Sequence, residues 1–389
     1  MQDLQKLIQH YQTEAFNLRD DLHREPELAF EEFKTNAKVR AFLDRHQIDY
    51  VSPIAKTGIL ATVKGKFPGK TVLLRGDMDA LPIQEDLTHP NPSQIAGKMH
   101  ACGHDGHTAS LALSAVILNQ LRDQIHGTIK FLFQPAEEAI GGAKVMIEEG
   151  ALEGVDAAFG GHLWGLGLEK TAATKKGPFM ASPDTFKIIV HGKAGHASKP
   201  QMAIDAILVA SQIVVNIQSL ISRQIDPFET AVISIGKMHG GTASNIIADE
   251  VIVEGTIRTI DEYVRKEIPK KMQKLVEGIA ESYGAQADFI YEPQYPVLVN
   301  HPEMTEIALS VLKDVLGKNN VEELQRADMG GEDFAYIAQT VPSCFMFVGI
   351  AKDKNHLINH HTPYFDFENP NIAVLSEVLM KCALSYLEK

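Results

Sequence analysis

Residues 100–107, "HACGHDGH", carry an unusual concentration of reactive side chains. This stretch holds three histidines, one aspartate and one of only three cysteines in the chain. A thiol beside imidazoles oxidises readily unless it binds a metal or takes part in catalysis. Cys102 and His104 are therefore candidate metal ligands, whereas Cys344 and Cys382 lie in apolar segments and are interpreted as buried hydrophobic residues.

Further candidate ligands follow apolar runs that are typical of buried strands. Asp77 and Asp79 end "VLLRGDMDA", Glu137 and Glu138 follow "IKFLFQPA", and His162 ends "AAFGGH". In a parallel sheet such strand ends meet at one edge, so we expect these side chains to converge. Carboxylate, imidazole and thiolate groups are the ligands of divalent transition metals. The spacing therefore predicts a metal site, to which "NHHTPYF" near the C-terminus adds a further histidine.

Each of these residues also has a purely structural interpretation. A single histidine such as His162 is often a buried side chain with satisfied hydrogen bonds. The pair Glu137 and Glu138 could begin a helix, where acidic residues complement the helix dipole. Asp77 and Asp79 could be turn residues. Their joint occurrence at predicted strand ends favours the metal site.

The surrounding elements predict an α/β fold with an inserted domain. Near-continuous apolar strands at 72–74 and 129–133, separated by helical patterns, are typical of a largely parallel sheet covered on both faces. Within 182–293 apolar and polar residues alternate, as in antiparallel strands exposed on one side, and two helices complete a βαββαβ-like α+β unit. We therefore predict a catalytic domain formed by 1–181 and 294–389, interrupted by a satellite domain formed by 182–293.

Composition narrows the partners. The 389 residues include 37 Lys and Arg against 50 Asp and Glu, which gives a net charge of −13, and no basic run neutralises phosphates. Nucleic acid is therefore not an expected partner. The N-terminal stretch is polar, no eighteen apolar residues follow one another, and the low cysteine content suits a reducing compartment. We expect a cytoplasmic protein that does not associate with a membrane.

Several longer motifs resemble one known family. "RDDLHREPELAFEE", "LRGDMDALP", "MHACGHDGHTA", "FQPAEE", "GHASKP", "GGTASNIIAD", "EGTIRT", "GGEDFAY" and "HHTPYF" occur in order along nearly the whole chain. They resemble the signatures of the M20 metallopeptidase family, in its amidohydrolase branch. The resemblance implies a zinc-exopeptidase-like α/β/α catalytic domain with two divalent metal ions, and an inserted ferredoxin-like satellite domain. Sulfur favours zinc, while carboxylate and imidazole also suit manganese, cobalt or nickel.

The resemblance also implies the ligands and their helpers. The C-terminal ligand would be His361 rather than His360, because the family's ligand is followed by one variable residue and then Pro. Glu137 would be the proton shuttle beside the metals. Asp79 would orient a ligand, although a structural turn residue is an equal alternative. The implied ligands are Cys102, as a bridge, with His104, Glu138, His162 and His361.

The satellite domain is expected to contribute to substrate binding. His196, in "GHASKP", would hold the developing oxyanion or the substrate carboxylate, and in the family the matching histidine reaches the site of the other subunit. Asn245 and Arg258 resemble positions that bind the carboxylate of the amino acid. For Arg258, a surface pair with Glu254 or Glu250 is the structural alternative. Residues 184–195 have the pattern of an edge strand, which predicts a homodimer formed through the satellite.

These features predict a metal-dependent hydrolase of N-acyl amino acids, acting on a linear amide. Two alternatives stay open: a dipeptidase or aminopeptidase of the same family, and a non-catalytic metal-containing protein that binds acylated amino acids. Glu137 separates the enzymes from the binding protein, because only an enzyme requires an additional carboxylate beside the ligands.

Overall fold

The chain forms two compact units, which are described separately. The computed structural model describes residues 4–88, 90–139 and 141–388. The large unit comprises Met1–Phe179, Val299–Arg326 and Asp333–Lys389, and the satellite unit comprises Met180–Leu298 and Ala327–Glu332. The short segment Ala327–Glu332 belongs to the satellite unit, whereas the sequence analysis assigns it to the catalytic domain.

The large unit is built on an eight-stranded sheet in the order β1-β2-β4-β3-β5-β16-β6-β15. Its central strands β4, β3, β5 and β16 are parallel, whereas β1 and β2, β2 and β4, and β16 and β6 pair antiparallel. The edge strand β15 pairs parallel with β6. This agrees with the predicted, largely parallel sheet. The strands are β1 (Asp49–Ile54), β2 (Gly58–Lys64), β3 (Phe67–Asp77), β4 (His126–Gln134), β5 (Ala157–Leu168), β6 (Ala172–Thr174), β15 (Val321–Glu323) and β16 (Ser343–Ala351).

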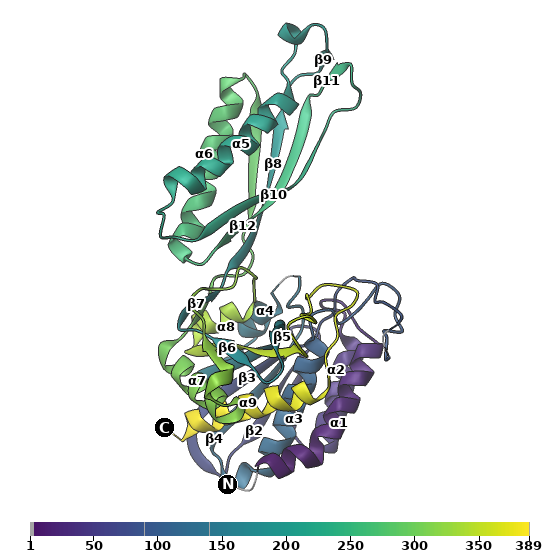
Figure 1. Cartoon of the computed structure of the whole chain (residues 1–389), viewed down its shortest axis with the longest axis vertical. Coiled ribbons are helices and arrows are strands. Elements are labelled where there is room, and N and C mark those ends of the chain that lie inside the picture. Colours follow the sequence, from purple (N-terminus) through teal and green to yellow (C-terminus); the bar gives the residue numbers. More distant parts are fainter. Residues whose placement is uncertain (1–3, 89, 140, 389) are drawn as a thin grey trace. The chain divides into compact units, whose positions relative to one another are not determined.

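Helices cover both faces of this sheet. Alternate residues of β16 point to opposite sides, as the pleat requires: Met346 and Val348 belong to the main hydrophobic core, whereas Phe345 packs on Phe334 of α8. Figure 1 shows α1, α3 and α9 side by side across the large unit. The helices are α1 (Leu4–Arg24), α2 (Phe33–Arg45), α3 (His104–Gln120), α4 (Gly142–Glu148), α7 (Pro302–Leu316), α8 (Phe334–Thr340) and α9 (Pro370–Leu387).

Helix α3 is the central helix of the large unit. Every residue from His104 to Leu118 is buried, so the helix has no polar solvent face and its sequence is apolar on all sides after the first turn. It contacts α1, α9 and β3. Because α3 is fixed in this way, the position of its first residue, His104, is fixed with it.

The satellite unit is a four-stranded antiparallel sheet with two helices on one face. Its strand order β10-β12-β8-β13 and its chain order β8-α5-β10-β12-α6-β13 are those of a ferredoxin-like fold, as predicted. The elements are β8 (Ser182–His191), α5 (Ala206–Gln224), β10 (Ala231–Gly240), β12 (Glu250–Thr259), α6 (Glu262–Ser282) and β13 (Gln286–Glu292), with the short strands β9 (Gly195–His196) and β11 (Ile246–Ile247) forming a separate ribbon. Two further short strands, β7 (Gly177–Met180) and β14 (Leu298–Asn300), pair with each other.

The predicted edge strand within 184–195 is wrong. Strand β8 pairs with β12 on one side and with β13 on the other, so it is internal to the sheet. The alternating pattern that suggested an edge arises instead because only one face of the sheet is covered by helices. The edges are β10 and β13.

Helix α5 is long and apolar enough to cross a membrane by length and composition alone. One face of the helix, including Val209, Ile213 and Ile217, lies in the core of the satellite unit. The opposite face is mixed: Val215 on it is 69% exposed, and the polar Ser211 and Asn216 are exposed beside it. The helix is therefore a core helix with some apolar residues on its outer face.

Candidate metal centre

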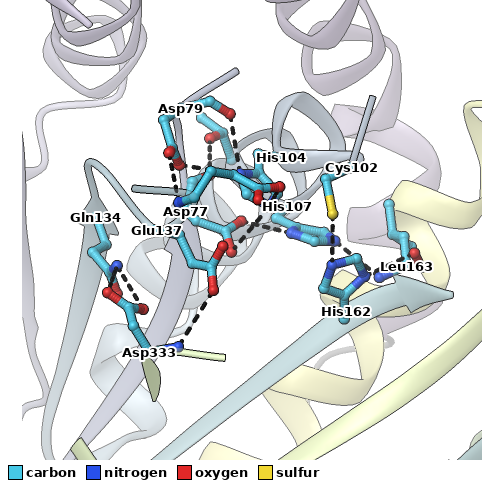
Figure 2. Close-up of polar contacts among 12 residues, drawn as sticks. Asp77, Asp79, Cys102, His104, His107, Gln134, Glu137, His162, Leu163 and Asp333 are labelled. Atoms are coloured by element: carbon cyan, nitrogen blue, oxygen red, sulfur yellow. Dashed lines mark hydrogen bonds and ion pairs between the residues drawn. The ribbon is translucent and has the colours of Figure 1, made fainter. Parts of the chain in front are cut away.

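The predicted ligands of the large unit converge where β3 ends. Asp77 is the last residue of β3, and the register of β3 with β5 places His162 beside this end, although β5 itself continues to Leu168. The sequence predicts His162 at the end of its strand, but the structure places it in the middle. Figure 2 shows the side chains from β3, β5, the start of α3 and the loop after β4 turned toward one another.

Asp79 fixes the orientation of two candidate ligands. His104 Nδ1 lies 3.0 Å from the backbone oxygen of Asp79 and 3.1 Å from its Oδ1, so Nδ1 carries the proton and donates (Figure 2). Nε2 is thus the ring nitrogen left to bind a metal, and it lies 3.8 Å from Glu138 Oε1. The second carboxylate oxygen of Asp79 accepts from the backbone N–H of Glu138 at 2.9 Å. One carboxylate therefore holds both residues, as expected of a group that orients metal ligands.

His162 is oriented by its own strand. Its Nδ1 donates to the backbone oxygen of Leu163 at 2.9 Å, which directs the unprotonated Nε2 to within 3.4 Å of Cys102 Sγ. Burial, followed by the neighbouring His107, lowers the pKa of His162 well below its usual range, so the ring is neutral. A neutral imidazole with an inward-facing lone pair is the form that binds a metal.

His361 and Glu138 complete the cluster. His361 Nε2 lies 3.1 Å from Glu138 Oε1. This contact lacks hydrogen-bond geometry, and within the described part of the chain Glu138 Oε1 is a buried oxygen without a hydrogen-bond partner. The backbone N–H of His361 donates to Ala101 O at 2.8 Å, which ties the C-terminal segment to the loop that carries Cys102. A buried carboxylate oxygen of this kind indicates a missing positive partner.

The electrostatics of the cluster also favour a cation. Burial, together with the carboxylates of Glu138, Glu137 and Asp77, raises the pKa of the Cys102 thiol well above its usual range. Although burial lowers the pKa of His104, the negative charges of Asp77, Asp79 and Glu138 raise it to about 10. A divalent ion would displace these protons and compensate the clustered anions.

The donor atoms fall into two groups that share a single residue. In each group the three candidate ligand atoms, one from each residue, lie within 4.8 Å of one another. Cys102 is the residue common to both. The groups are Cys102, His104 and His162, and Cys102, Glu138 and His361. Their chemistry, thiolate with imidazole and carboxylate, suits divalent transition metals, so the residues present fit two such ions.

Comparison with known proteins agrees with this geometry. The model of peptidase family M20/M25/M40 matches residues 73–385. The chain belongs to the M20 peptidase family. An N-acetylcysteine deacetylase of Bacillus subtilis is 41% identical over 97% of this chain and 98% of its own length.

Two further M20 proteins broaden the comparison. Thermostable carboxypeptidase 2 of Saccharolobus solfataricus is 39% identical over 94% of this chain and 93% of its own length. The crystal structure of YxeP from Bacillus subtilis, described as a dinuclear metal-binding peptidase of the M20 family, is 37% identical, covers 98% of this chain and 99% of its own, and superimposes with a TM-score of 0.85. These matches confirm the resemblance and the predicted fold class.

In this M20 chain Glu137 lies beside the ligand groups in a strained loop. It is buried, and its Oε1 accepts from the backbone N–H of Asp333 at 3.3 Å. The preceding Ala136 has a positive φ of 56°, which is unfavourable for a residue with a side chain. Gly142 makes this loop possible, because a Cβ there would lie 1.8 Å from the backbone oxygen of Pro135.

A second buried carboxylate holds this loop from behind. Glu32 accepts from the backbone N–H of Ala136 at 2.9 Å and from Thr57 Oγ1 at 2.6 Å. Burial raises the pKa of Glu32 to about 7. The motif "ELAFEE", which ends at Glu32, is part of the family pattern, but nothing in the sequence predicts that Glu32 lies behind Glu137.

An ion network that the sequence did not predict lies beneath the ligands. Arg75 donates to Asp77 Oδ2 and to Asp333 Oδ1, each at 2.7 Å, and all three residues are buried. Asp77 Oδ1 is 2.6 Å from His107 Nδ1, and His107 Nε2 accepts from the backbone N–H of Leu163 at 2.9 Å. Asp77 is therefore part of a chain of hydrogen bonds that ends beside His162.

Helix α1 supports the start of α3 through a second network. Arg19 Nε donates to Asp105 Oδ2 at 2.9 Å. His23 lies between two carboxylates, with Nδ1 2.8 Å from Asp105 Oδ2 and Nε2 3.0 Å from Glu85 Oε1. Burial alone lowers the pKa of His23, but the hydrogen bonds to Asp105 and Glu85 outweigh it and raise the pKa to about 9.

The structure brings together two of the predicted satellite residues. His196 in β9 pairs with Ile246 in β11, and the backbone N–H of Ala197 donates to Asn245 O at 3.1 Å. His196 Nδ1 accepts from the backbone N–H of Ser198 at 3.1 Å, so the proton of the neutral ring is on Nε2. His196 is exposed and can therefore offer an N–H donor.

Arg258 lies elsewhere in the satellite unit. It is near the C-terminal end of β12 and pairs with Pro183, whereas β12 begins at Glu250 close to the ribbon of β9 and β11. Eight residues of strand separate Glu250 from Arg258, which is about 26 Å. Within one satellite unit Arg258 does not join His196 and Asn245. The surface ion pair between Arg258 and Glu254 is also absent within the described residues, because Glu254 forms its ion pair with Lys237.

Proposed function

We propose that this chain is a metal-dependent amidohydrolase that uses two divalent ions to hydrolyse the amide bond of N-acyl amino acids. One observation carries the proposal: two ligand groups share Cys102, with the lone pairs of His104 and His162 directed inward and Glu137 beside them. The 41% identity to an N-acetylcysteine deacetylase over nearly the whole chain supports this substrate class.

The proposed ligands have separate tasks. Cys102 would serve as a ligand in both groups, with His104 and His162 holding one ion and Glu138 and His361 holding the other. Asp79 holds the His104 ring and the Glu138 backbone in position. Bound there, the two ions would polarise the amide carbonyl and lower the pKa of water so that it loses its proton near neutral pH.

Glu137 is the proposed proton carrier. Its carboxylate lies within 4.8 Å of the donor atoms of His104 and Glu138, so it reaches the same space without being needed in either group that contains Cys102. The N–H of Asp333 holds one oxygen of Glu137 in place. Glu137 would accept a proton from the attacking water and deliver it to the nitrogen of the departing amino acid.

We assign substrate contacts to the satellite unit. The exposed Nε2–H of His196 would donate to the carbonyl oxygen as negative charge develops on it. Asn245, its neighbour across the ribbon, would bind the carboxylate of the amino acid. Because Arg258 lies too far along β12 to join Asn245 within one satellite unit, it would bind the same group from the other subunit of a dimer. A homodimer through the satellite fits the edge strand β10, on which Val232 is 43% exposed, and the exposed Val215 of α5.

A substrate screen tests this function. Metal-loaded protein is incubated with N-acetyl, N-benzoyl and longer N-acyl amino acids and, separately, with dipeptides that have a free amine. The proposal predicts release of the amino acid from the acylated set, and no release by the Glu137→Gln variant. Faster turnover of the dipeptides would favour a peptidase, a class suggested by the carboxypeptidase relative. Tight binding of acyl amino acids without hydrolysis would favour the non-catalytic alternative.

A further inference from the structure

His360 lies next to the metal centre but has no role in the proposed ligand set. Its ring is packed among three others: Trp164 at 5.0 Å between centroids, Phe365 at 4.9 Å and His162 at 5.0 Å. The rings of Trp164 and Phe365 are tilted by only 32° and 35° relative to it. This packing fixes the plane of the His360 ring and so the direction of its two nitrogen atoms.

The hydrogen bonds of His360 define its tautomer. The backbone N–H of Gly165 donates to His360 Nε2 at 3.0 Å. A backbone N–H can only donate, so Nε2 must carry the lone pair and the proton of the ring must be on Nδ1. His360 Nδ1 lies 3.7 Å from Cys102 Sγ, a normal separation for an N–H donor and a sulfur acceptor.

This orientation is opposite to that of the proposed ligands. His104 and His162 donate their Nδ1–H groups to oxygen atoms and turn a lone pair toward the cluster. His360 turns its N–H toward the cluster and its lone pair toward the backbone. It therefore has no lone pair available for a metal on the side that faces Cys102.

We propose that His360 is a positioning residue that donates a hydrogen bond from Nδ1 to the sulfur of Cys102 and thereby tunes this sulfur as a metal ligand. The inference rests on the proposed role of Cys102 in binding metal. A hydrogen bond to a ligating thiolate withdraws electron density from the sulfur. It weakens electron donation to the metals and makes the sulfur less reactive toward oxidants.

Two substitutions separate the hydrogen bond to sulfur from the hydrogen bond to Gly165. The amide of asparagine occupies the place of Nδ1 in histidine, so His360→Asn keeps a donor toward Cys102 and loses the acceptor for Gly165. The amide of glutamine reaches the place of Nε2, so His360→Gln keeps the acceptor for Gly165 and loses the donor to sulfur. His360→Phe keeps a stacked ring without any donor and serves as a second donor-free variant.

Cobalt-loaded protein provides the first measurement. The absorption band in which sulfur transfers charge to cobalt reports directly on the sulfur electrons. We expect His360→Gln and His360→Phe to move this band to lower energy, and His360→Asn to leave it near its position in the unsubstituted protein. Absence of the band from the unsubstituted protein would instead refute metal binding by Cys102, and with it the proposed function.

Oxidation of Cys102 by hydrogen peroxide, followed by mass spectrometry of the metal-loaded protein, is the second measurement. We expect the donor-free variants to oxidise about threefold faster or more, and His360→Asn to oxidise at the unsubstituted rate. Equal behaviour of the Asn and Gln variants in both measurements would overturn the inference, as would a change confined to His360→Asn, which would assign the effect to Gly165.

Discussion

The buried His23 makes a prediction about stability that can be worked out from its two partners. Its ring lies between the carboxylates of Asp105 and Glu85, which are both buried. Two acceptors can be satisfied together only when both ring nitrogens carry protons, so the folded protein holds His23 as a cation. We consider the substitution His23→Gln, which keeps a polar side chain of similar reach and removes the titration.

The expected magnitude follows from the pKa of His23. Folding raises this pKa from 6.5 to about 9. At 1.36 kcal/mol for each pKa unit, the charged ring contributes roughly 3 kcal/mol to the free energy of unfolding. Because the folded pKa is the higher one, the contribution is complete below pH 6.5 and is lost as the pH rises through about 9.

Unfolding by denaturant, followed by fluorescence, measures this contribution where it acts. Trp164 is the only tryptophan of the chain and lies in β5 of the large unit, so its emission reports on the unit that contains His23. The unsubstituted protein should lose roughly 3 kcal/mol between pH 6.5 and about 9, and the difference between it and His23→Gln should shrink by the same amount. His126→Gln, at an exposed histidine, is the matched control and should leave the profile unchanged.

A different outcome would refute the reasoning. If His23→Gln and the unsubstituted protein lost stability in parallel across this pH range, His23 would not be charged in the folded state.

Three further predictions concern the catalytic residues. Glu137→Gln should lower turnover by at least about 10²-fold with metal content unchanged, whereas Glu138→Gln should lose metal. Kinetics and elemental analysis of the two variants measure these effects. The reverse pattern would exchange the roles of the two residues. Cys102→Ser should bind less metal than the unsubstituted protein under equal loading, and full occupancy would contradict a bridging thiolate. If His196 acts on the partner's site, mixing Glu137→Ala with His196→Ala under subunit exchange should restore about a quarter of the sites, whereas a site within one chain predicts no recovery despite proven exchange.

The sequence was most informative where residue type and strand pattern coincide. Cys102, His104 and Glu138 follow recognisable strand or helix boundaries, so their convergence could be expected from the parallel sheet alone. The βαββαβ order of the satellite could be predicted from the alternation of strands and helices, and the ferredoxin-like fold from the family resemblance. The sequence predicts that Asp79 orients a metal ligand but not which one. The structure shows that Asp79 contacts both His104 and Glu138.

The rest depended on tertiary contacts that leave no local signal. Arg75 reads as an interruption of an apolar strand, and its partner Asp333 is 258 positions away along the chain. The internal position of β8 could not be read from alternation, since edge and internal strands with one covered face share that pattern. The separation of Arg258 from His196 likewise follows from the length of β12, not from either motif.

The most direct test of the account is a metal titration of chelator-treated protein. Activity on an N-acetyl amino acid and the amount of bound metal are measured together as a divalent ion such as cobalt is added. The account predicts no activity without metal and a plateau at two ions per chain, with Cys102→Ser failing to reach it. Full activity of the metal-free protein, or a plateau at two ions that Cys102→Ser reproduces with full activity, would contradict it.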